Sequence, residues 1–470
     1  MTATTSSSVG WKETRRYILP AGFVGTFLEW FDMFVYAQAA ALIFPHLFFP
    51  KLDPTAGTLA SFATFGVGYL ARPLGGIIFG HVGDKHGRKM ALIMTLTLMG
   101  CATVLVGCLP TYSAIGIAAP VLLVILRLAQ GLGSGAEYAG SLTLVGELAP
   151  AKQRGFWTSI CGSGIYLGQM SAAIIGVTLF STLNSDALYS WGWRIPFLAS
   201  ILLIVVGIAM RMRISESPVF QALEARQNVR KVPAFTVFHK APLRLILSLA
   251  LTAPIAFNSY MTTTYGLTFS VGKGVPKADA LTGVIIACFL AIFLVPLTGY
   301  LSDRYGRKPV FLIQVAMTGI IAFPYFAILN TGNVPLLFLA SLLFIAPTNM
   351  ALTGSQAPYL PELFASAYRY SGVAMSRELT TAGLTSFTPI VGLGLVSLLD
   401  GQPWALAGAC LFVSLLSFTA VCFLPETRGI VMTPDAADTS EAEAVPVDGT
   451  VDGTVDGTAD GDDETASVVA

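Results

Sequence analysis

The sequence predicts an all-α membrane protein whose twelve transmembrane helices form two pseudo-symmetric six-helix bundles. Three observations lead to this fold class: the composition, the length and number of the apolar runs, and landmarks that recur in the same order in both halves of the chain. Of the 470 residues, 54% are hydrophobic and only 11% are charged. Soluble domains carry about 25% charged residues, so this composition favours a chain that crosses a membrane several times.

The apolar runs define the individual helices. A helix that crosses a bilayer needs about 20 predominantly apolar residues. Twelve runs meet this requirement, at approximately 17–43, 56–83, 89–109, 116–146, 155–181, 195–212, 243–270, 279–301, 309–330, 334–357, 370–399 and 403–424. An even number of spans places both ends of the chain on the same side of the membrane.

The basic residues indicate which side that is. Lysine and arginine concentrate in the cytoplasmic loops of membrane proteins. If the N-terminus is cytoplasmic, most loop lysines and arginines fall in inner segments, and the outer connections hold only Lys51, Arg194, Lys273 and Lys277. We therefore expect both termini on the cytoplasmic side of the cell membrane.

Charge and spacing divide the chain into five regions. We expect a cytoplasmic N-terminal segment at 1–16, a first six-helix bundle at 17–212, a cytoplasmic connection at 213–242, a second bundle at 243–430 and a cytoplasmic tail at 431–470. The tail holds eleven acidic residues and no basic ones, and it contains VDGT three times in succession. Low hydrophobicity and charge of a single sign predict that this tail is disordered.

The two halves repeat each other. GHVGDKHGRK at 80–89 follows the second span, and GYLSDRYGRK at 299–308 follows the eighth. A Glu and an Arg seven residues apart follow the fourth span and again the tenth, as Glu147 with Arg154 and Glu362 with Arg369. Repeats of this kind are typical of transporters that rock one half of the molecule against the other.

These motifs resemble the inner-loop signature of the major facilitator superfamily. Within it, the chain resembles the metabolite:proton symporters, which include carriers for shikimate, α-ketoglutarate, citrate and proline or betaine. FPHLFFP and the segment DPTAGTLASFATFGVGYLARP most resemble the shikimate-type branch. The stretches that carry this resemblance are GTFLEWFDMFVY, LARPLGGIIFGHVGDKHGRK, RLAQGLGSGAEYAG, SWGWRIPF, SESPVF and PELFASAYRYSG. One departure is FASAYR at 364–369, where the family more often has Pro-Thr after the Phe.

The resemblance implies a major facilitator fold and a set of gating contacts on the inner side. Asp84 is expected at the N-terminal end of span eleven, where the helix dipole favours a carboxylate. Arg88 is expected to pair with Glu147, and Arg307 with Glu362. The full set of expected gating residues is Asp84, Arg88, Glu147, Arg154, Asp303, Arg307, Glu362 and Arg369. The alternative is that these charges only fix the topology of the loops.

Ionisable residues inside the spans form the candidate functional site. A charge at mid-membrane costs about 2.5–3.5 kcal/mol on insertion scales, so such residues usually line a cavity or pair internally. The clearest cases are Glu29, Asp32, Arg72, Arg127 and Glu137, all in the first half. Helical geometry places Glu29 about 18 Å into its span.

Helical spacing also groups the polar residues around these charges. Asp32 and Tyr36 share a helix face with Glu29. On span four, a polar stripe includes Arg127, Gln130, Ser134, Glu137, Tyr138 and Ser141. Such a stripe either glues helices together or lines a water-filled pathway, and the ionisable members favour the pathway. The second half contributes mainly neutral groups, such as Tyr260 and Asn349, and of the adjacent Arg377 and Glu378 at most one need face the cavity.

A transport mechanism follows from these assignments. Burial in a low dielectric favours the protonated form of a carboxyl group, so Asp32 is the expected proton carrier, assisted by Glu29. Arg127 is expected to bind a substrate carboxylate bidentately, and Glu137 to tune Arg127 or share the proton. Arg72 is either a partner of Asp32 or a second substrate anchor. The expected substrate-binding set is Arg127, Tyr36, Gln130, Arg72, Tyr260 and Asn349.

We therefore expect a monomeric secondary transporter that imports a small organic acid together with protons by alternating access. Uptake of a zwitterionic osmolyte such as proline or betaine is the alternative, and a transporter-like sensor is a further one. The four histidines show no metal-binding spacing, and no nucleophile–base pair stands out. We expect no metal, cofactor, nucleic-acid partner or enzymatic activity.

Overall fold

The computed structural model describes residues 19–86, 88–135, 137–212, 233–365, 368–398, 400, 402–430 and 432, and in these residues it has helices joined by loops and no strand. The first bundle contains α2 (Leu19–Leu42), α4 (Pro54–His86), α5 (Arg88–Cys108), α7 (Ala118–Ser134), α8 (Glu137–Leu148), α9 (Arg154–Thr182) and α11 (Ile195–Met212). Each of the six apolar runs predicted for the first half thus corresponds to one helix or, for span four, to α7 and α8 in succession.

The second bundle follows the same order. It contains α14 (Pro242–Tyr260), η4 (Met261–Tyr265), α15 (Gly266–Gly272), α16 (Lys277–Tyr305), α17 (Arg307–Asn330), α18 (Val334–Ala340), η5 (Ser341–Met350), α19 (Leu352–Glu362), α20 (Arg369–Thr380), η6 (Thr381–Thr385), α21 (Thr388–Leu398) and α22 (Trp404–Phe423). The predicted fold class, twelve helices in two six-helix bundles, is confirmed.

Short helices occupy the connections. These are α3 (Phe44–Phe48), α6 (Tyr112–Ile115), η2 (Ala151–Gln153), α10 (Ser185–Ser190), η3 (Gly192–Arg194) and α13 (Pro233–Lys240). α13 falls in the predicted connection at 213–242. The predicted N-terminal segment at 1–16 lies outside the described residues, as does the acidic tail apart from Met432.

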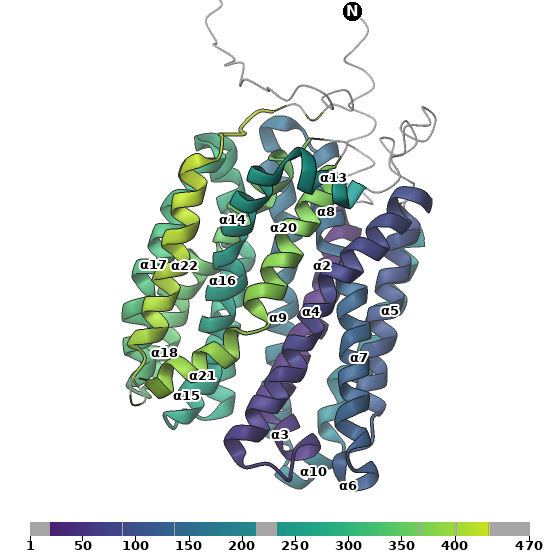
Figure 1. Cartoon of the computed structure of the whole chain (residues 1–470). Coiled ribbons are helices and arrows are strands. Elements are labelled where there is room, and N and C mark those ends of the chain that lie inside the picture. Colours follow the sequence, from purple (N-terminus) through teal and green to yellow (C-terminus); the bar gives the residue numbers. More distant parts are fainter. Residues whose placement is uncertain are drawn as a thin grey trace, which may run out of the picture.

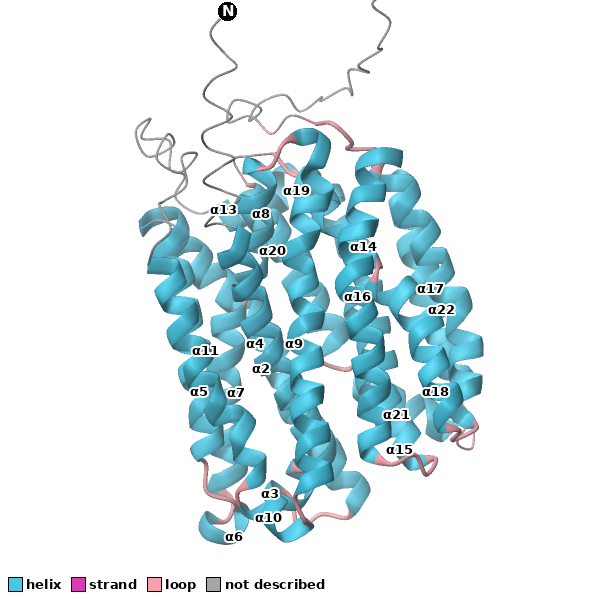
Figure 2. Ribbon diagram, turned by 180° about the vertical axis from the view of Figure 1, so that it is seen from behind, coloured by secondary structure: helices cyan, strands magenta, loops and turns pink. Residues whose placement is uncertain are grey.

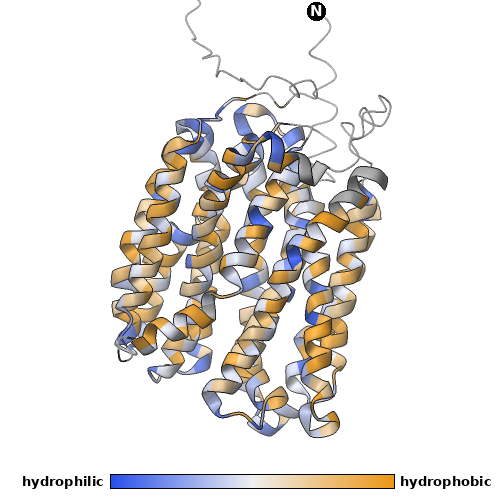
Figure 3. Cartoon of the chain, in the orientation of Figure 1, coloured by the Kyte–Doolittle hydropathy of each residue, from blue (hydrophilic) through white to orange (hydrophobic). Residues whose placement is uncertain are grey.

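Length and apolarity support a membrane location for these helices. In the described part of the chain, ten helices are long and apolar enough to cross a membrane, or eleven if Arg369–Thr385 and Ile390–Leu398, bent by 41°, count as one span. α2 is not among them although it has 24 residues; it carries Glu29 and Asp32. Figure 3 shows hydrophobic residues along most of the helices, with many hydrophilic residues near their ends.

The two bundles lie side by side, with the first half on one side of the molecule and the second half on the other (Figures 1 and 2). α9 packs along α16, and α4 packs against α20 and η6, so spans five, eight, two and eleven join the halves. α5 packs with α11, and α17 with α22, at the periphery. Leu202 in α11 and Phe412 in α22 are 71% and 68% exposed, as expected for side chains that face lipid.

Three of the second-half spans contain a π-helical segment: η4 in span seven, η5 in span ten and η6 in span eleven. π-helical turns are rare and occur frequently at functional sites. Pro347 lies within η5, and a proline inside a helix removes one backbone hydrogen bond. These irregular segments lie in spans that the sequence predicted to carry polar residues.

We call one end of the molecule the inner end, after the cytoplasmic side that the loop charges predict for it. The connections α8–α9, α16–α17 and α19–α20 lie there, at the top of Figure 1.

Candidate functional site

Asp32 is buried in the first bundle and is held by hydroxyl groups. Its side chain lies on α2 and is 3% exposed. Thr103 on α5 donates a hydrogen bond to one carboxylate oxygen at 2.9 Å, and Ser200 on α11 donates to the other at 2.7 Å. Among the described residues, Asp32 has no ion-pair partner. A buried carboxyl group without a paired cation is able to exist in either protonation state.

Both hydroxyl groups also have a second acceptor within their own helix. Thr103 Oγ1 lies 3.0 Å from the carbonyl oxygen of Met99, and Ser200 Oγ lies 3.4 Å from that of Pro196. A hydroxyl group has one proton to donate. Each hydroxyl can therefore donate to Asp32 when the carboxylate is ionised and to a backbone carbonyl when Asp32 itself carries a proton.

A chain of hydrogen bonds connects Asp32 to Arg127. Gln130 Nε2 donates to Thr103 Oγ1 at 2.8 Å, and Arg127 Nη1 donates to Gln130 Oε1 at 2.5 Å. Gln130 and Arg127 lie one helical turn apart on α7, which explains why the amide reaches both groups. The carboxylate and the guanidinium are thus linked through two neutral side chains.

Arg127 is fully buried against aromatic rings instead of a carboxylate. Its guanidinium carbon lies 4.1 Å from the ring centroid of Tyr36, 5.3 Å from that of Phe65 and 6.0 Å from that of Tyr69. In the described part of the chain it forms no ion pair, and its Nε has no hydrogen-bond partner. Cation–π contacts stabilise a cation. Its Nη1 donates to Gln130 and its Nη2 donates to the sulfur of Met33 at 3.4 Å, so the Nε–H group is the donor that stays available for an anion.

Gly68 makes room for this guanidinium. A Cβ atom at Gly68 would collide with the Arg127 side chain. Gly131, on the same helix as Arg127, approaches the backbone of Gly68 so closely that a Cβ there would overlap its carbonyl group. The glycines on α4 and α7 therefore bring the two helices together and set the position of Arg127.

The second half closes this aromatic cluster through Tyr260. Its hydroxyl group forms a hydrogen bond with the hydroxyl of Tyr69. Its ring stacks on Phe34 at 6.1 Å and lies 5.9 Å from the ring of Phe65. Tyr36 is oriented by a 2.8 Å hydrogen bond to Thr64. The structure thus brings together four of the predicted substrate-binding residues, Arg127, Gln130, Tyr36 and Tyr260.

Glu29 and Arg72 form a separate charge cluster. Arg72 Nη2 pairs with Glu29, and Arg72 Nε pairs with Glu378 on α20 at 2.7 Å. Glu29 and Arg72 are completely buried, and Glu378 is 1% exposed. Arg72 therefore does not pair with Asp32, one of its two expected roles, because its carboxylate partners are Glu29 and Glu378. Its other expected role, a second substrate anchor, stays a prediction, and its guanidinium carbon lies 5.3 Å from the ring centroid of Tyr69. Glu29 and Asp32, although on one helix face, reach different partners.

Glu137 pairs with Arg211 at the end of α11. Thr95 on α5 adds a weak hydrogen bond to the other carboxylate oxygen at 3.4 Å. Glu137 thus has Arg211 as its ion-pair partner, and the roles expected for it, tuning Arg127 or sharing the proton, stay predictions. All these groups are buried, so Glu137 belongs to the packing between α8, α5 and α11.

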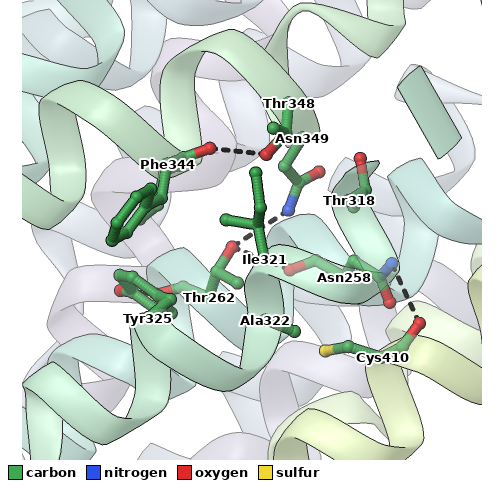
Figure 4. Close-up of a pocket in the computed structure, with 11 residues that line it drawn as sticks. Asn258, Thr262, Thr318, Ile321, Ala322, Tyr325, Phe344, Thr348, Asn349 and Cys410 are labelled. Atoms are coloured by element: carbon green, nitrogen blue, oxygen red, sulfur yellow. Dashed lines mark hydrogen bonds between the residues drawn. The ribbon is translucent and has the colours of Figure 1, made fainter. Parts of the chain in front are cut away.

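Asn349 lies in a polar pocket within the second bundle (Figure 4). The residues that line the pocket are Asn258, Thr262, Thr318, Ile321, Ala322, Tyr325, Phe344, Ile345, Thr348, Asn349 and Cys410. Asn349 Nδ2 donates to Thr262 Oγ1 at 3.1 Å, and the side-chain oxygens of Asn258 and Asn349 have no partner. The residues come from α14, η4, α17, η5 and α22, so this pocket is distinct from the Arg127 cluster.

At the inner end, two ion pairs cross between the halves in a reciprocal manner. Arg154 of the first half pairs with Glu362 of the second at 3.0 Å, and Arg369 of the second half pairs with Glu147 of the first at 3.2 Å. All four residues belong to the predicted gating set. The exchange follows the internal repeat, because each Glu–Arg motif contributes its Glu to one pair and its Arg to the other.

Glu362 has more partners than a single arginine. Arg307 contacts both of its carboxylate oxygens, at 3.0 and 3.2 Å, and Thr427 donates to it at 2.6 Å. The predicted contact between Arg307 and Glu362 is therefore present. Arg154 also donates to the carbonyl of Ile430 at 2.8 Å, so the segment after α22 takes part in the closed inner end.

Asp303 occupies the N-terminal end of α9. Its carboxylate accepts hydrogen bonds from the backbone amides of Gly155 at 2.8 Å and Phe156 at 2.9 Å. These amides have no partner within the helix, and the helix dipole favours a negative charge there. This contact is the pseudo-symmetric counterpart of the one predicted for Asp84. The side chains of Asp84 and Arg88 lie outside the described residues.

Comparison with known proteins identifies the family. Residues 22–377 match the family model described as Major Facilitator Superfamily. The chain belongs to this superfamily. It is 37% identical over 421 residues to the inner membrane metabolite transport protein YhjE of Escherichia coli (strain K12), covering 86% of this chain and 94% of that protein. It is 35% identical over 384 residues to the shikimate transporter of the same strain, covering 81% and 87%.

Other relatives transport different solutes. The chain is 33% identical over 456 residues to the glycine betaine/proline/ectoine/pipecolic acid transporter OusA of Dickeya dadantii (strain 3937), covering 92% of this chain and 88% of that protein. The solved proton:xylose symporter XylE, bound to 6-bromo-6-deoxy-D-glucose, superposes with a TM-score of 0.71 over 88% of this chain and 97% of that chain. At 18% identity this likeness shows the fold alone. The protein is therefore a multi-pass membrane transporter of small molecules and not an enzyme.

The sequence alone did not indicate several residues that contact the buried charges of the candidate site. Thr103 and Ser200 lie in spans three and six, which contain no charge in their cores, and a lone hydroxyl in an apolar helix is a weak signal. Arg211 lies in the last turn of α11, next to the charged inner connection, and that position does not indicate a buried Glu as its partner. The sequence shows Glu378 as a charged residue inside span eleven, but helical spacing does not predict which residue of the other half it contacts.

Proposed function

We propose that the protein is a proton-coupled symporter that imports a small organic acid across the cytoplasmic membrane by alternating access. One observation carries this proposal. Asp32 and Arg127 are buried opposite charges that share a hydrogen-bonded chain, yet neither forms an ion pair with a described residue. Asp32 is therefore suited to bind a proton, and Arg127 to bind an anion.

The charge balance explains how the two events are coupled. The other buried carboxylates within the spans lie against arginines: Glu29 and Glu378 share Arg72, with Arg377 next to Glu378 in the sequence, and Glu137 pairs with Arg211. A proton on Asp32 leaves the positive charge of Arg127 without compensation in a low-dielectric region. A substrate carboxylate on Arg127 restores the balance, so proton and anion bind together, with one proton for each carboxylate at this site.

The aromatic cluster is expected to bind the body of the substrate. Tyr36, Phe65, Tyr69 and Tyr260 surround the guanidinium and combine apolar faces with hydroxyl groups. A small acid with a ring or an aliphatic body and hydroxyl groups is complementary to such a lining. The relatives named as shikimate and metabolite transporters are in keeping with this substrate class.

The inner-end ion pairs supply the gate in this proposal. Arg154–Glu362 and Arg369–Glu147 hold the two halves together at that end, and these contacts must break when the site opens towards the cytoplasm. The proposal further places both termini in the cytoplasm and treats the transporter as a monomer with bundles at 17–212 and 243–430.

Uptake of a zwitterionic osmolyte is the second candidate. Aromatic faces bind quaternary ammonium groups, and one relative is named as a betaine and proline transporter. However, Arg127 already occupies the faces of Tyr36 and Phe65, which leaves less aromatic surface for a second cation. We therefore favour the acid.

A substrate screen in proteoliposomes tests the proposal. Purified protein would be assayed for uptake of shikimate, α-ketoglutarate, citrate, aromatic acids and betaine, with an inward proton gradient and again with a protonophore. We expect one of the acids to accumulate only when the gradient is intact. Accumulation of betaine but none of the acids would establish the alternative. Accumulation that is unchanged when the protonophore is added would exclude proton coupling.

A further inference from the structure

A buried ion pair joins the two halves of the molecule at mid-membrane depth. Arg72 on α4 contacts Glu378 on α20 at 2.7 Å, and both side chains are at most 2% exposed. The other ion pairs that join the halves in the described part of the chain, Arg154–Glu362 and Arg369–Glu147, lie at the inner end. If the halves rock against each other, this contact has to open as well.

Opening such a contact ordinarily leaves charges unpaired. Removing one partner of a buried ion pair is strongly destabilising because the remaining charge has lost both water and its counter-charge. Arg72 keeps a counter-charge when the contact opens, because Glu29 of its own half also pairs with it. Glu378 requires a replacement partner in the second half.

Arg377 is our candidate for that partner; neighbours on a helix point about 100° apart, so its long side chain must turn from the first half toward Glu378. It precedes Glu378 on α20, is 7% exposed, and is one of the two positive charges that act on Glu378. Its guanidinium lies 3.7 Å from the ring centroid of Tyr138 and 5.3 Å from that of Trp30, both in the first half. Its Nη1 has no hydrogen-bond partner among the residues that the structure describes. When the halves separate, Arg377 loses these rings and retains a free donor.

We propose that Glu378 exchanges Arg72 for Arg377 when the halves separate at this depth. The four charges then divide into two neutral pairs, Glu29 with Arg72 in the first half and Arg377 with Glu378 in the second. Arg377 and Glu378 are thus positioning residues for the conformational change of transport: they permit the buried contact to open without leaving an unpaired charge. This role is independent of which substrate or ion drives transport.

The rate of thiol labelling at the interface measures this opening. Ala139 on α8 is 1% exposed and packs into a cluster of apolar residues from the second half. In a background without the six native cysteines, Ala139→Cys reacts with a bulky water-soluble maleimide only when the halves separate. The assay uses purified protein and needs neither substrate nor proton gradient, so its outcome is separate from that of the proposed function.

The variants give opposite predictions. Arg377→Gln removes the replacement partner and is expected to slow labelling by about tenfold, because the separated state then contains an unpaired Glu378. Arg377→Lys retains the charge and is expected to label like the parent. Glu378→Gln removes the contact to Arg72 and is expected to speed labelling by about tenfold. Arg304→Gln, at an exposed site on α16, serves as a control that leaves the rate unchanged.

The double variant Arg377→Gln/Glu378→Gln decides the question. With no carboxylate left to pair, the loss of Arg377 no longer hinders separation, so the double variant is expected to label at least as fast as the parent. If Arg377→Gln labels at or above the parental rate, or if the double variant remains as slow as Arg377→Gln, the exchange of partners does not occur. Monodisperse elution of each variant confirms that it is folded.

Discussion

Asp32 and Arg127 are the two ends of one hydrogen-bonded chain that contains only two other side chains, Thr103 and Gln130. A direct ion pair would hold both charges in their ionised forms and would compete with substrate for the guanidinium. We propose that the indirect link leaves Asp32 able to bind a proton and Arg127 able to bind an anion, and that the chain lets each respond to the state of the other.

Thr103 is expected to couple the protonation of Asp32 to the binding of an anion at Arg127. Thr103→Val removes the hydroxyl that contacts both Asp32 and Gln130, whereas Thr103→Ser retains it. Since a hydrogen bond to a charged group contributes about 1.5–3 kcal/mol, we expect Thr103→Val to lower proton-driven uptake by roughly tenfold or more. Uptake rates in proteoliposomes check this, and equal rates for the valine and serine variants would show that the hydroxyl has no part in coupling.

Arg127 is expected to hold the substrate carboxylate through paired N–H groups. Arg127→Lys keeps the charge but loses the planar fork that binds a carboxylate bidentately, and Arg127→Gln loses both. We expect the KM for the acid to rise about tenfold for lysine and further for glutamine. Concentration dependence of uptake is the measurement. An unchanged KM in Arg127→Gln would place the carboxylate elsewhere.

Gly68 offers a test of the same site that changes no charge. A Cβ at position 68 would collide with the Arg127 side chain, whereas a Cβ at Gly394 on α21 would meet nothing within 4 Å. Overpacking costs about 1–3 kcal/mol, so Gly68→Ala is expected to raise the KM by roughly tenfold while Gly394→Ala leaves it unchanged. If both alanine variants behave like the parent, the position of Arg127 does not control binding.

The inner-end ion pairs are expected to hold the two halves together by electrostatic attraction. Glu147→Gln weakens the contact with Arg369, and Glu147→Arg replaces attraction by repulsion. Breaking a buried pair costs about 3–5 kcal/mol, so labelling of Ala139→Cys should rise in the glutamine variant and rise further in the arginine variant. Equal labelling rates in the two variants would indicate lost packing instead of lost attraction.

The helices could be predicted from the sequence because apolar length and loop charge are local properties. All twelve apolar runs correspond to helices. The repeated motifs also predicted the contact of Arg307 with Glu362, but not the reciprocal pairs Arg154–Glu362 and Arg369–Glu147 that join the halves. The π-helical segments in spans seven, ten and eleven were not predicted, since they depend on packing between neighbouring helices.

The partners of buried charges could not be predicted in the same way. Helical spacing placed Glu29 and Asp32 on one face, about 60° apart. An angular separation of this size is enough to direct Glu29 to Arg72 and Asp32 to Thr103 and Ser200. A helical wheel gives the direction of a side chain but not the identity of the helix that it meets.

Transport by Asp32→Asn tests the central claim most directly. Asparagine keeps the size of the side chain and one carbonyl acceptor for the hydroxyl donors, but it binds no proton. In proteoliposomes, we predict that Asp32→Asn loses accumulation of the acid driven by a proton gradient, while exchange of labelled for unlabelled acid at equal concentrations continues. Accumulation that remains dependent on the proton gradient in Asp32→Asn would contradict the assignment of Asp32 as the proton carrier.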